Sequence, residues 1–182
     1  MTGRLWAALV ISLLVLGCAG KDAKKPVTFA DPKLEAEARS ALGNPDGPLT
    51  AARLASVKQL LAVRKGIVNL AGIESMKGLR RLDLSQNQVS DLAPLAGLAN
   101  LSDLNLAFNQ ISDLKPLTDL YNVVNLDLQG NKIVDIAPLV RLRDLGGLVP
   151  TSHVLLHNNP LGKKAKDVDI PFLKSEYVNV NY

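Results

Sequence analysis

The sequence predicts a solenoid of stacked α/β repeats, with a parallel sheet on its concave side and short 3₁₀ turns on its convex side. A 22-residue segment occurs three times without a gap, at residues 79–100, 101–122 and 123–144. Each copy reads L-x-x-L-x-L-x-x-N-x-I/V-x-D-L/I-x-P-L-x-x-L, with Val as the first residue of the third copy. A fixed period of this length is typical of repeat architectures, because one unit cannot bury its apolar side but a stack can.

The first half of each repeat is predicted to be a strand followed by a turn. Apolar and polar residues alternate in the L-x-L core, which indicates a short strand with inward-pointing leucines. The Asn three residues after the second Leu falls where the chain must turn, and its side chain can bond backbone groups that lack a strand partner. Stacked copies of this Asn therefore predict a ladder. Its members are Asn87, Asn109 and Asn131.

The second half of each repeat is predicted to be a 3₁₀ turn. Its Pro has a fixed φ and no N–H, which disfavours a long α-helix. The Asp that opens each turn (Asp91, Asp113 and Asp135) is interpreted as a cap of that turn. An acid that recurs at a structural position is poor support for a catalytic acid, and the sequence contains none of the common catalytic motifs.

The repeat extends in both directions, so that about five repeats are expected over residues 57–161. One period earlier the apolar pattern continues, but Lys65 replaces the Asn, so the ladder should begin one repeat later. Towards the C-terminus, Leu128 and Leu156 are 28 residues apart instead of 22. The extra residues fall within 142–150 and predict a longer loop on the return side, where insertions cost little.

Residues 28–56 are expected to form a helical N-terminal cap, since terminal repeats need polar covers. Asp31 can cap the start of a helix whose first residue is Pro32. Thr50 can begin a second helix, with an apolar face that extends as far as Leu61.

Residues 162–182 are expected to form the C-terminal cap. A short helix is predicted around residues 164–173, interrupted by Pro171. The alternating residues 177–180 predict a last strand that closes the sheet.

These motifs resemble the 22-residue leucine-rich repeat of bacterial internalin-like proteins. The resemblance implies a leucine-rich-repeat solenoid with the small helical N-terminal cap of that family. It also implies that the tail after the N-P-L segment at residues 159–161 closes the sheet.

Residues 1–17 resemble a bacterial lipoprotein signal peptide rather than part of the fold. Arg4 precedes an apolar run of 12 residues, which has the length of a signal sequence and is too short to span a bilayer. The resemblance implies lipidation of Cys18, followed by a polar tether over residues 18–27. Ala19 implies sorting to the outer membrane. The alternatives are a secretory signal with a chance Cys, and an uncleaved anchor.

Composition argues against a disulfide-stabilised protein and against a nucleic-acid-binding protein. Cys18 is the only cysteine, so the fold has no disulfide. The formal net charge of +4 is mild and favours neither a nucleic acid nor a strongly charged partner. No cofactor is predicted.

The phase of the strands predicts which residues face outward on the concave side. Asp83, Asn105 and Asp127 should form a polar row on strands about 4.8 Å apart, and Ser85 and Ala107 should also face outward. The candidate partner-binding residues are Arg81, Asp83, Asp103, Asn105, Phe108, Asp127, Gln129, His153 and His157. The alternative is a solvated sheet face that is polar only because it meets water.

Three of these candidates, Phe108, His153 and His157, are aromatic residues. Phe108 lies just past its strand, and exposed aromatic residues are common binding hot spots. His153 and His157 should stand about 13 Å apart on one strand, too far for a shared metal, so no metal site is predicted.

We therefore expect a non-enzymatic, protein-binding lipoprotein of the bacterial cell envelope, most simply a monomer, attached to the membrane through its N-terminal lipid. One alternative is a lipoprotein that binds carbohydrate or peptidoglycan through Asp, Asn and Phe108. The other is a structural lipoprotein without a specific ligand.

Overall fold

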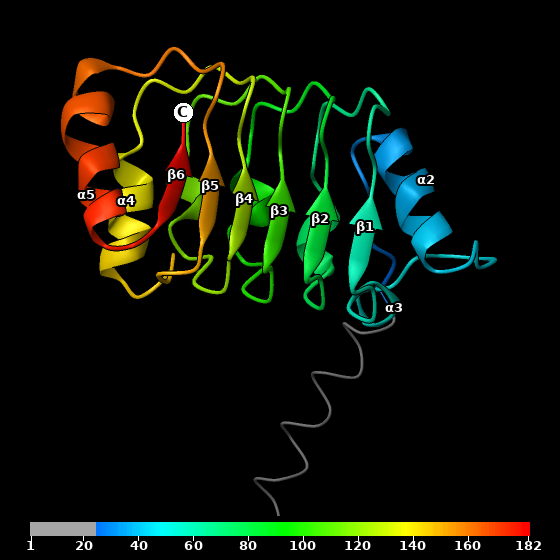
Figure 1. The fold of residues 1–182 in the computed structure, drawn as a ribbon. Coiled ribbons are helices and arrows are strands. Elements are labelled where there is room, and N and C mark those ends of the chain that lie inside the picture. The colour runs from blue at the N-terminus through cyan, green and yellow to red at the C-terminus, as the bar shows by residue number, and fades with distance from the viewer. Residues whose placement is uncertain (1–24) are drawn as a thin grey trace, which may run out of the picture.

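The computed structural model describes residues 25–182. These residues form the leucine-rich-repeat solenoid that the sequence predicts, drawn in Figure 1. The predicted signal peptide at residues 1–17, Cys18 and most of the predicted tether lie outside the described residues. In the described part of the chain, no helix is long and apolar enough to cross a membrane.

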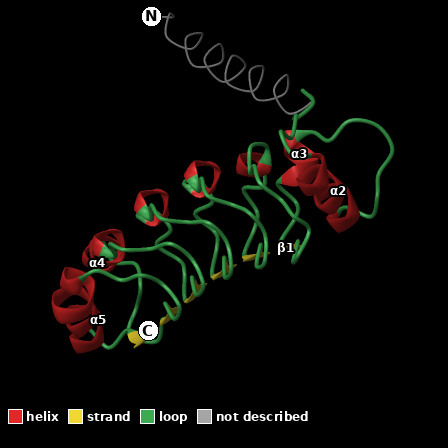
Figure 2. Cartoon of the chain, turned by 90° about the horizontal axis from the view of Figure 1, so that it is seen from above, coloured by secondary structure: helices red, strands yellow, loops and turns green. Residues whose placement is uncertain are grey.

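A six-stranded parallel sheet forms one side of the stack, with its strands in sequence order. Equivalent residues of successive repeats are in register, so that Leu82 pairs with Leu104 and Leu104 with Leu126. The strands are β1 (Gln59–Leu61), β2 (Arg81–Asp83), β3 (Asp103–Asn105), β4 (Asn125–Asp127), β5 (His153–Leu155) and β6 (Asn179–Asn181). Figure 2 shows the strands and the helical turns on opposite sides of the stack. We call the sheet side the concave face and the helical side the convex face.

Short 3₁₀ turns form the convex face of the first repeats, as predicted. They are η1 (Ile73–Ser75), η2 (Ala93–Leu95) and η3 (Lys115–Leu117). The predicted turn caps are also confirmed. Asp91 accepts a hydrogen bond from the Ala93 N–H at 2.8 Å, and Asp113 and Asp135 accept from the N–H two residues later at 2.9 Å.

The third repeat differs from the others, because its convex side is the α-helix α4 (Ala137–Asp144). The prediction of a 3₁₀ turn is wrong here, but the longer return side is confirmed, because residues 145–152 continue as turns and loop between α4 and β5. Pro138 lies in the first turn of α4, where its missing N–H leaves no hydrogen bond unmade. Leu139 and Leu142 are buried like their equivalents in the other repeats, and Leu148 of the additional residues adds a further buried side chain to the core.

The asparagine ladder is confirmed, and it holds the turns of neighbouring repeats together. Asn109 is 4% exposed, accepts from the Val89 N–H at 2.9 Å, and donates to the carbonyls of Leu84 and Leu106 at 2.9 and 3.0 Å. Asn87, Asn131 and Asn159 repeat this pattern. The ladder begins at Asn87, whose side chain accepts from the backbone N–H of Lys65, as expected.

At the N-terminal end, α2 (Pro32–Ala41) covers the first repeat beside β1. Asp31 caps α2 by accepting from the Lys33 N–H at 2.9 Å, and its other oxygen accepts from the Val68 N–H at 2.8 Å. This carboxylate therefore joins the cap to the repeats. The second helix, α3 (Ala51–Leu54), is shorter than predicted, because the following residues up to Leu61 enter β1 and pair with β2.

At the C-terminal end, a π-helical segment (Ala165–Asp169) leads into α5 (Ile170–Ser175). In this wider segment the Ile170 N–H donates to the Ala165 carbonyl, five residues back. Pro171 follows directly, so the helix continues where an interruption was predicted. The last strand, β6, spans Asn179–Asn181 rather than residues 177–180, because Tyr177 turns the chain with a φ of 61°.

Candidate functional site

The parallel register places polar residues in rows across the concave face. The row at the first strand position consists of Gln59, Arg81, Asp103, Asn125, His153 and Asn179. The row at the third position consists of Leu61, Asp83, Asn105, Asp127, Leu155 and Asn181. Residues far apart in the sequence thus form one continuous surface.

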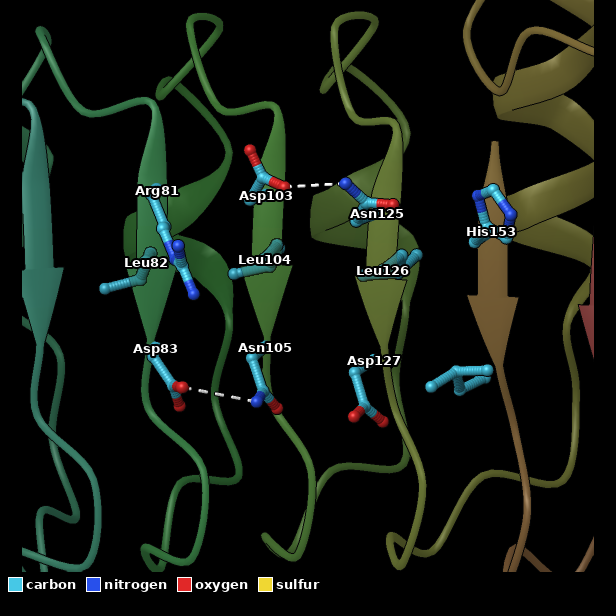
Figure 3. A pocket seen from close by; sticks show the side chains of 11 residues that line it. Arg81, Leu82, Asp83, Asp103, Leu104, Asn105, Asn125, Leu126, Asp127 and His153 are labelled. Carbon is cyan, nitrogen blue, oxygen red and sulfur yellow. Dashed lines mark hydrogen bonds between the residues drawn. The ribbon is translucent and has the colours of Figure 1, made fainter. Parts of the chain in front are cut away.

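A shallow groove of about 380 Å³ crosses β2 to β5 on this face (Figure 3). The groove brings together six of the nine candidates: Arg81, Asp83, Asp103, Asn105, Asp127 and His153. Phe108, Gln129 and His157 lie beyond it. Asn125 and Leu155 also line it. Both residues occupy outward strand positions, which could have identified them from the sequence, although neither was chosen as a candidate.

Asp103 is the most firmly held carboxylate of the groove. One of its oxygens accepts from Asn125 Nδ2 at 2.6 Å, and the other accepts from Ser102 Oγ at 2.7 Å. The hydrogen bonds from Asn125 and Ser102 lower the pKa of Asp103 below its ordinary value of 3.8, and Arg81 adds a smaller favourable charge. Asp103 therefore presents a fixed negative charge at neutral pH.

The row of Asp83, Asn105 and Asp127 has a structural role that the sequence reasoning missed. Each side chain accepts a hydrogen bond from the backbone N–H two residues later, at 2.9, 3.0 and 3.1 Å respectively. An Asx turn of this kind ends β2, β3 and β4. The recurrence of Asp or Asn at this position therefore has a cause in the fold, whether or not a ligand binds there.

The remaining polar atoms of this row interact sideways. Asn105 Nδ2 donates to Asp83 Oδ2 at 3.3 Å, and Gln129 Nε2 donates to Asp127 Oδ2 at 3.0 Å. The side chains of the row are thus oriented before any partner arrives. Ser85 and Ala107 were predicted to face outward, but both are buried, because the chain turns after the Asx residue and the strand alternation ends there.

A column of left-handed residues borders the concave face where the strands turn. Its members are Arg64, Gln86, Phe108, Gly130 and Asn158, with φ values of 55°, 59°, 56°, 66° and 58°. Arg64 Nε donates to Gln86 Oε1 at 2.8 Å. Phe108 is 48% exposed, and its ring lies against Gly130.

His153 and His157 are both exposed, and His153 stands in the first row beside Asn125. Within residues 25–182, the His, Cys, Asp and Glu side chains form no group of three or more that could hold a metal ion.

Comparison with known proteins gives a fold and a repeat family. The family model for leucine-rich repeats (2 copies) matches residues 77–119. No curated protein matches the sequence. An internalin (InlF) from Listeria monocytogenes is similar in structure, with a TM-score of 0.65 and 26% sequence identity over 73% of this chain and 45% of that chain. The chain therefore spans less than half the length of that internalin.

Two further Listeria monocytogenes structures are more distant. Internalin C2 has 22% identity and a TM-score of 0.43, over 84% of this chain and 92% of that chain. InlJ has 18% identity and a TM-score of 0.41, over 73% of this chain and 37% of that chain. The matches to the repeat family and to InlF show that the chain carries leucine-rich repeats in an internalin-like fold.

Proposed function

We propose that this chain is a protein-binding leucine-rich-repeat module of the bacterial cell envelope, where a lipid on Cys18 anchors it to the outer membrane. Its function is recognition rather than catalysis. The partner binds across the concave face, and the membrane is reached only through the N-terminal lipid.

The observation that carries this proposal is the orientation of the groove side chains. Hydrogen bonds between neighbouring strands hold Asp103 to Asn125 and Asp83 to Asn105. Side chains that are ordered in advance lose little conformational entropy when a partner binds, which is how a small surface gains affinity. The groove covers four strands, so the interface is expected to bury at most about 800 Å² on each partner.

Capture of the partner from crosslinked cell envelopes tests the proposal. The concave variant Asn125→Ala/His153→Ala removes two exposed hydrogen-bonding side chains that line the groove and leaves its carboxylates in place. The control variant Lys115→Ala/Arg141→Ala removes two exposed basic side chains of the convex face. We expect the concave variant to reduce capture at least about tenfold, a loss of roughly 1.4 kcal/mol, and the control to capture as well as wild type. The reverse pattern would place the interface on the convex face.

A carbohydrate ligand is the second candidate, because one face of the exposed Phe108 ring is free to stack on a sugar. Carbohydrate binding predicts that soluble peptidoglycan fragments compete with the captured partner, or that no protein is captured at all. A structural lipoprotein predicts neither capture nor competition.

A further inference from the structure

The first observation concerns the conformation of Phe108. Bulky residues with a positive φ are uncommon, and the conformation costs about 1–2 kcal/mol for residues other than Gly, Asn and Asp. Phe108 combines this conformation with 48% exposure of an aromatic side chain. The corresponding residues of the other repeats are polar or glycine, so the turn itself does not require an aromatic ring. Arg64 and Gln86 have the same positive φ, so the conformation belongs to the turn, whereas the exposed aromatic ring does not, and the ring is the reason to look for a ligand.

The second observation is the support beneath the ring. Gly130 is the next residue of the left-handed column, with a φ of 66°. A Cβ on Gly130 would lie 2.8 Å from Phe108 Cε1, so the ring occupies the space that a side chain would need. The Phe108 ring therefore packs against the backbone of the neighbouring repeat, while about half of the side chain remains exposed. The ring forms a supported platform at the edge of the concave face.

The third observation is the charge beside this platform. The groove contains three carboxylates and one guanidinium, whereas the whole chain has a formal charge of +4. Asp127 precedes Gly130 by three residues, and because the chain turns between them they are separated by less than the roughly 10 Å of an extended chain. Asp103 stands on β3, the strand that leads to Phe108. An aromatic ring and a surplus of negative charge thus share one surface.

We propose that Phe108 and the groove carboxylates together recognise a basic, extended peptide segment, in which one Arg or Lys side chain lies over the Phe108 ring and adjacent basic side chains reach Asp103 and Asp127. This inference rests on the proposed function, because it specifies the partner of the same face. The ring attracts a cation through the negative charge of its π face. The carboxylates add charge complementarity, which an apolar anchor or a neutral sugar would not use.

A binding assay with the full-length protein tests this inference. The probe is a fluorescent peptide of alternating arginine and serine, compared with the same peptide carrying glutamate in place of arginine. We expect binding of the arginine peptide only, with an affinity that falls as ionic strength rises. Phe108→Trp should bind at least as tightly as wild type, and Phe108→Leu at least about threefold more weakly, because leucine keeps the bulk but lacks the π face.

A second variant tests the carboxylates separately. Asp127→Asn should weaken binding and reduce its dependence on salt. Asn105 already shows that Asn can accept the N–H bond at this strand position, so the turn should be retained. Two matched controls should bind as wild type. Tyr121→Leu changes an aromatic side chain that is 44% exposed in the segment after η3, and Asp144→Asn neutralises an exposed acid of α4.

The inference is wrong if the arginine peptide does not bind, or if Phe108→Leu and Asp127→Asn both bind as wild type. Competition by neutral peptidoglycan fragments that depends on Phe108 would overturn it in favour of a sugar ligand. In each case the capture experiment with Asn125→Ala/His153→Ala still decides separately whether the concave face binds a protein.

Discussion

At the scale of single residues, the asparagine ladder supplies hydrogen bonds where the strands end. The turn that follows each strand leaves backbone N–H and carbonyl groups inside the molecule without a strand partner. Asn109 bonds four backbone groups there, which belong to two successive repeats. Its side chain therefore stabilises the contact between repeats as well as its own turn.

Replacement of Asn109 by Ala should lower the free energy of unfolding by about 1–3 kcal/mol, because buried backbone groups would lose their partners. Asn100 is the control. It is exposed, and its Nδ2 donates to the Lys77 carbonyl at 2.8 Å on the convex side, where water can replace it. Asn100→Ala should cost less than about 0.5 kcal/mol. Denaturant midpoints of the two variants give the comparison, and equal shifts would contradict the assigned role of the ladder.

The role of a single residue could be predicted from the sequence only where that role follows from the 22-residue period. The ladder and the outward rows follow from the repeat, so Asn109 and Asp83 were placed correctly. The Asx turns of Asp83 and Asp127 were not anticipated, because the sequence alone does not say whether an outward carboxylate bonds the backbone or meets only water. The burial of Ala107 was missed for a similar reason, since alternation was continued past the end of the strand.

At the scale of elements, the central strands β2 to β5 were predicted at the right places, whereas the two end strands and the form of some connections were not. The return side of the third repeat was expected to be a turn and loop, because proline disfavours helix. A proline in the first turn does not disfavour it, and the spacing of Leu139 and Leu142 fits a helix as well as a loop. The second helix of the N-terminal cap was predicted too long, because apolar residues of a short strand such as β1 can also be read as one face of a helix.

The join between α2 and the first repeat should make stability depend on pH. Burial raises the pKa of Asp31, but hydrogen bonds from the N–H groups of Val68, Lys33 and Asn69 outweigh it, so the pKa lies below the ordinary value of 3.8. A depressed pKa in the folded state means that the ionised carboxylate stabilises the fold above the unfolded value. This contribution is lost as the pH falls through the lower, folded value.

Urea unfolding from about pH 6 down to about pH 2.5 should therefore show a smaller loss of stability in Asp31→Asn than in wild type. The asparagine can still accept one N–H bond but does not titrate. Asp144→Asn should leave the wild-type slope unchanged. An Asp31→Asn variant with the full wild-type pH dependence would show that this carboxylate does not link the cap to the repeats.

At the scale of the whole molecule, the solenoid is built from contacts between neighbouring repeats. Its concave face is therefore assembled from consecutive short segments, and each segment contributes residues to the same rows. The cap at one end is joined through Asp31, while α5 and β6 close the other end. A chain of this design needs no second copy to complete the groove.

The proposed anchor gives a prediction for the complete protein. A fatty-acid analogue supplied to expressing cells should label wild type and leave Cys18→Ala unlabelled, since Cys18 is the only cysteine and follows the apolar run. Wild type should also fractionate with the outer membrane. Equal labelling of the two proteins, or none of either, would exclude lipidation at this residue.

The longer third repeat has a consequence for how such a surface can evolve. Its extra residues lie on the convex side, and Asp127 still pairs with Leu155 across the added length. Genetic changes in loop length are therefore hidden behind the sheet, whereas duplication or deletion of residues 101–122 would move the two halves of the groove by one strand spacing, about 4.8 Å. The distance between binding residues can thus change only in steps of one strand spacing, set by the number of repeats. The outward side chains that each repeat contributes can change freely, because they do not pack in the core.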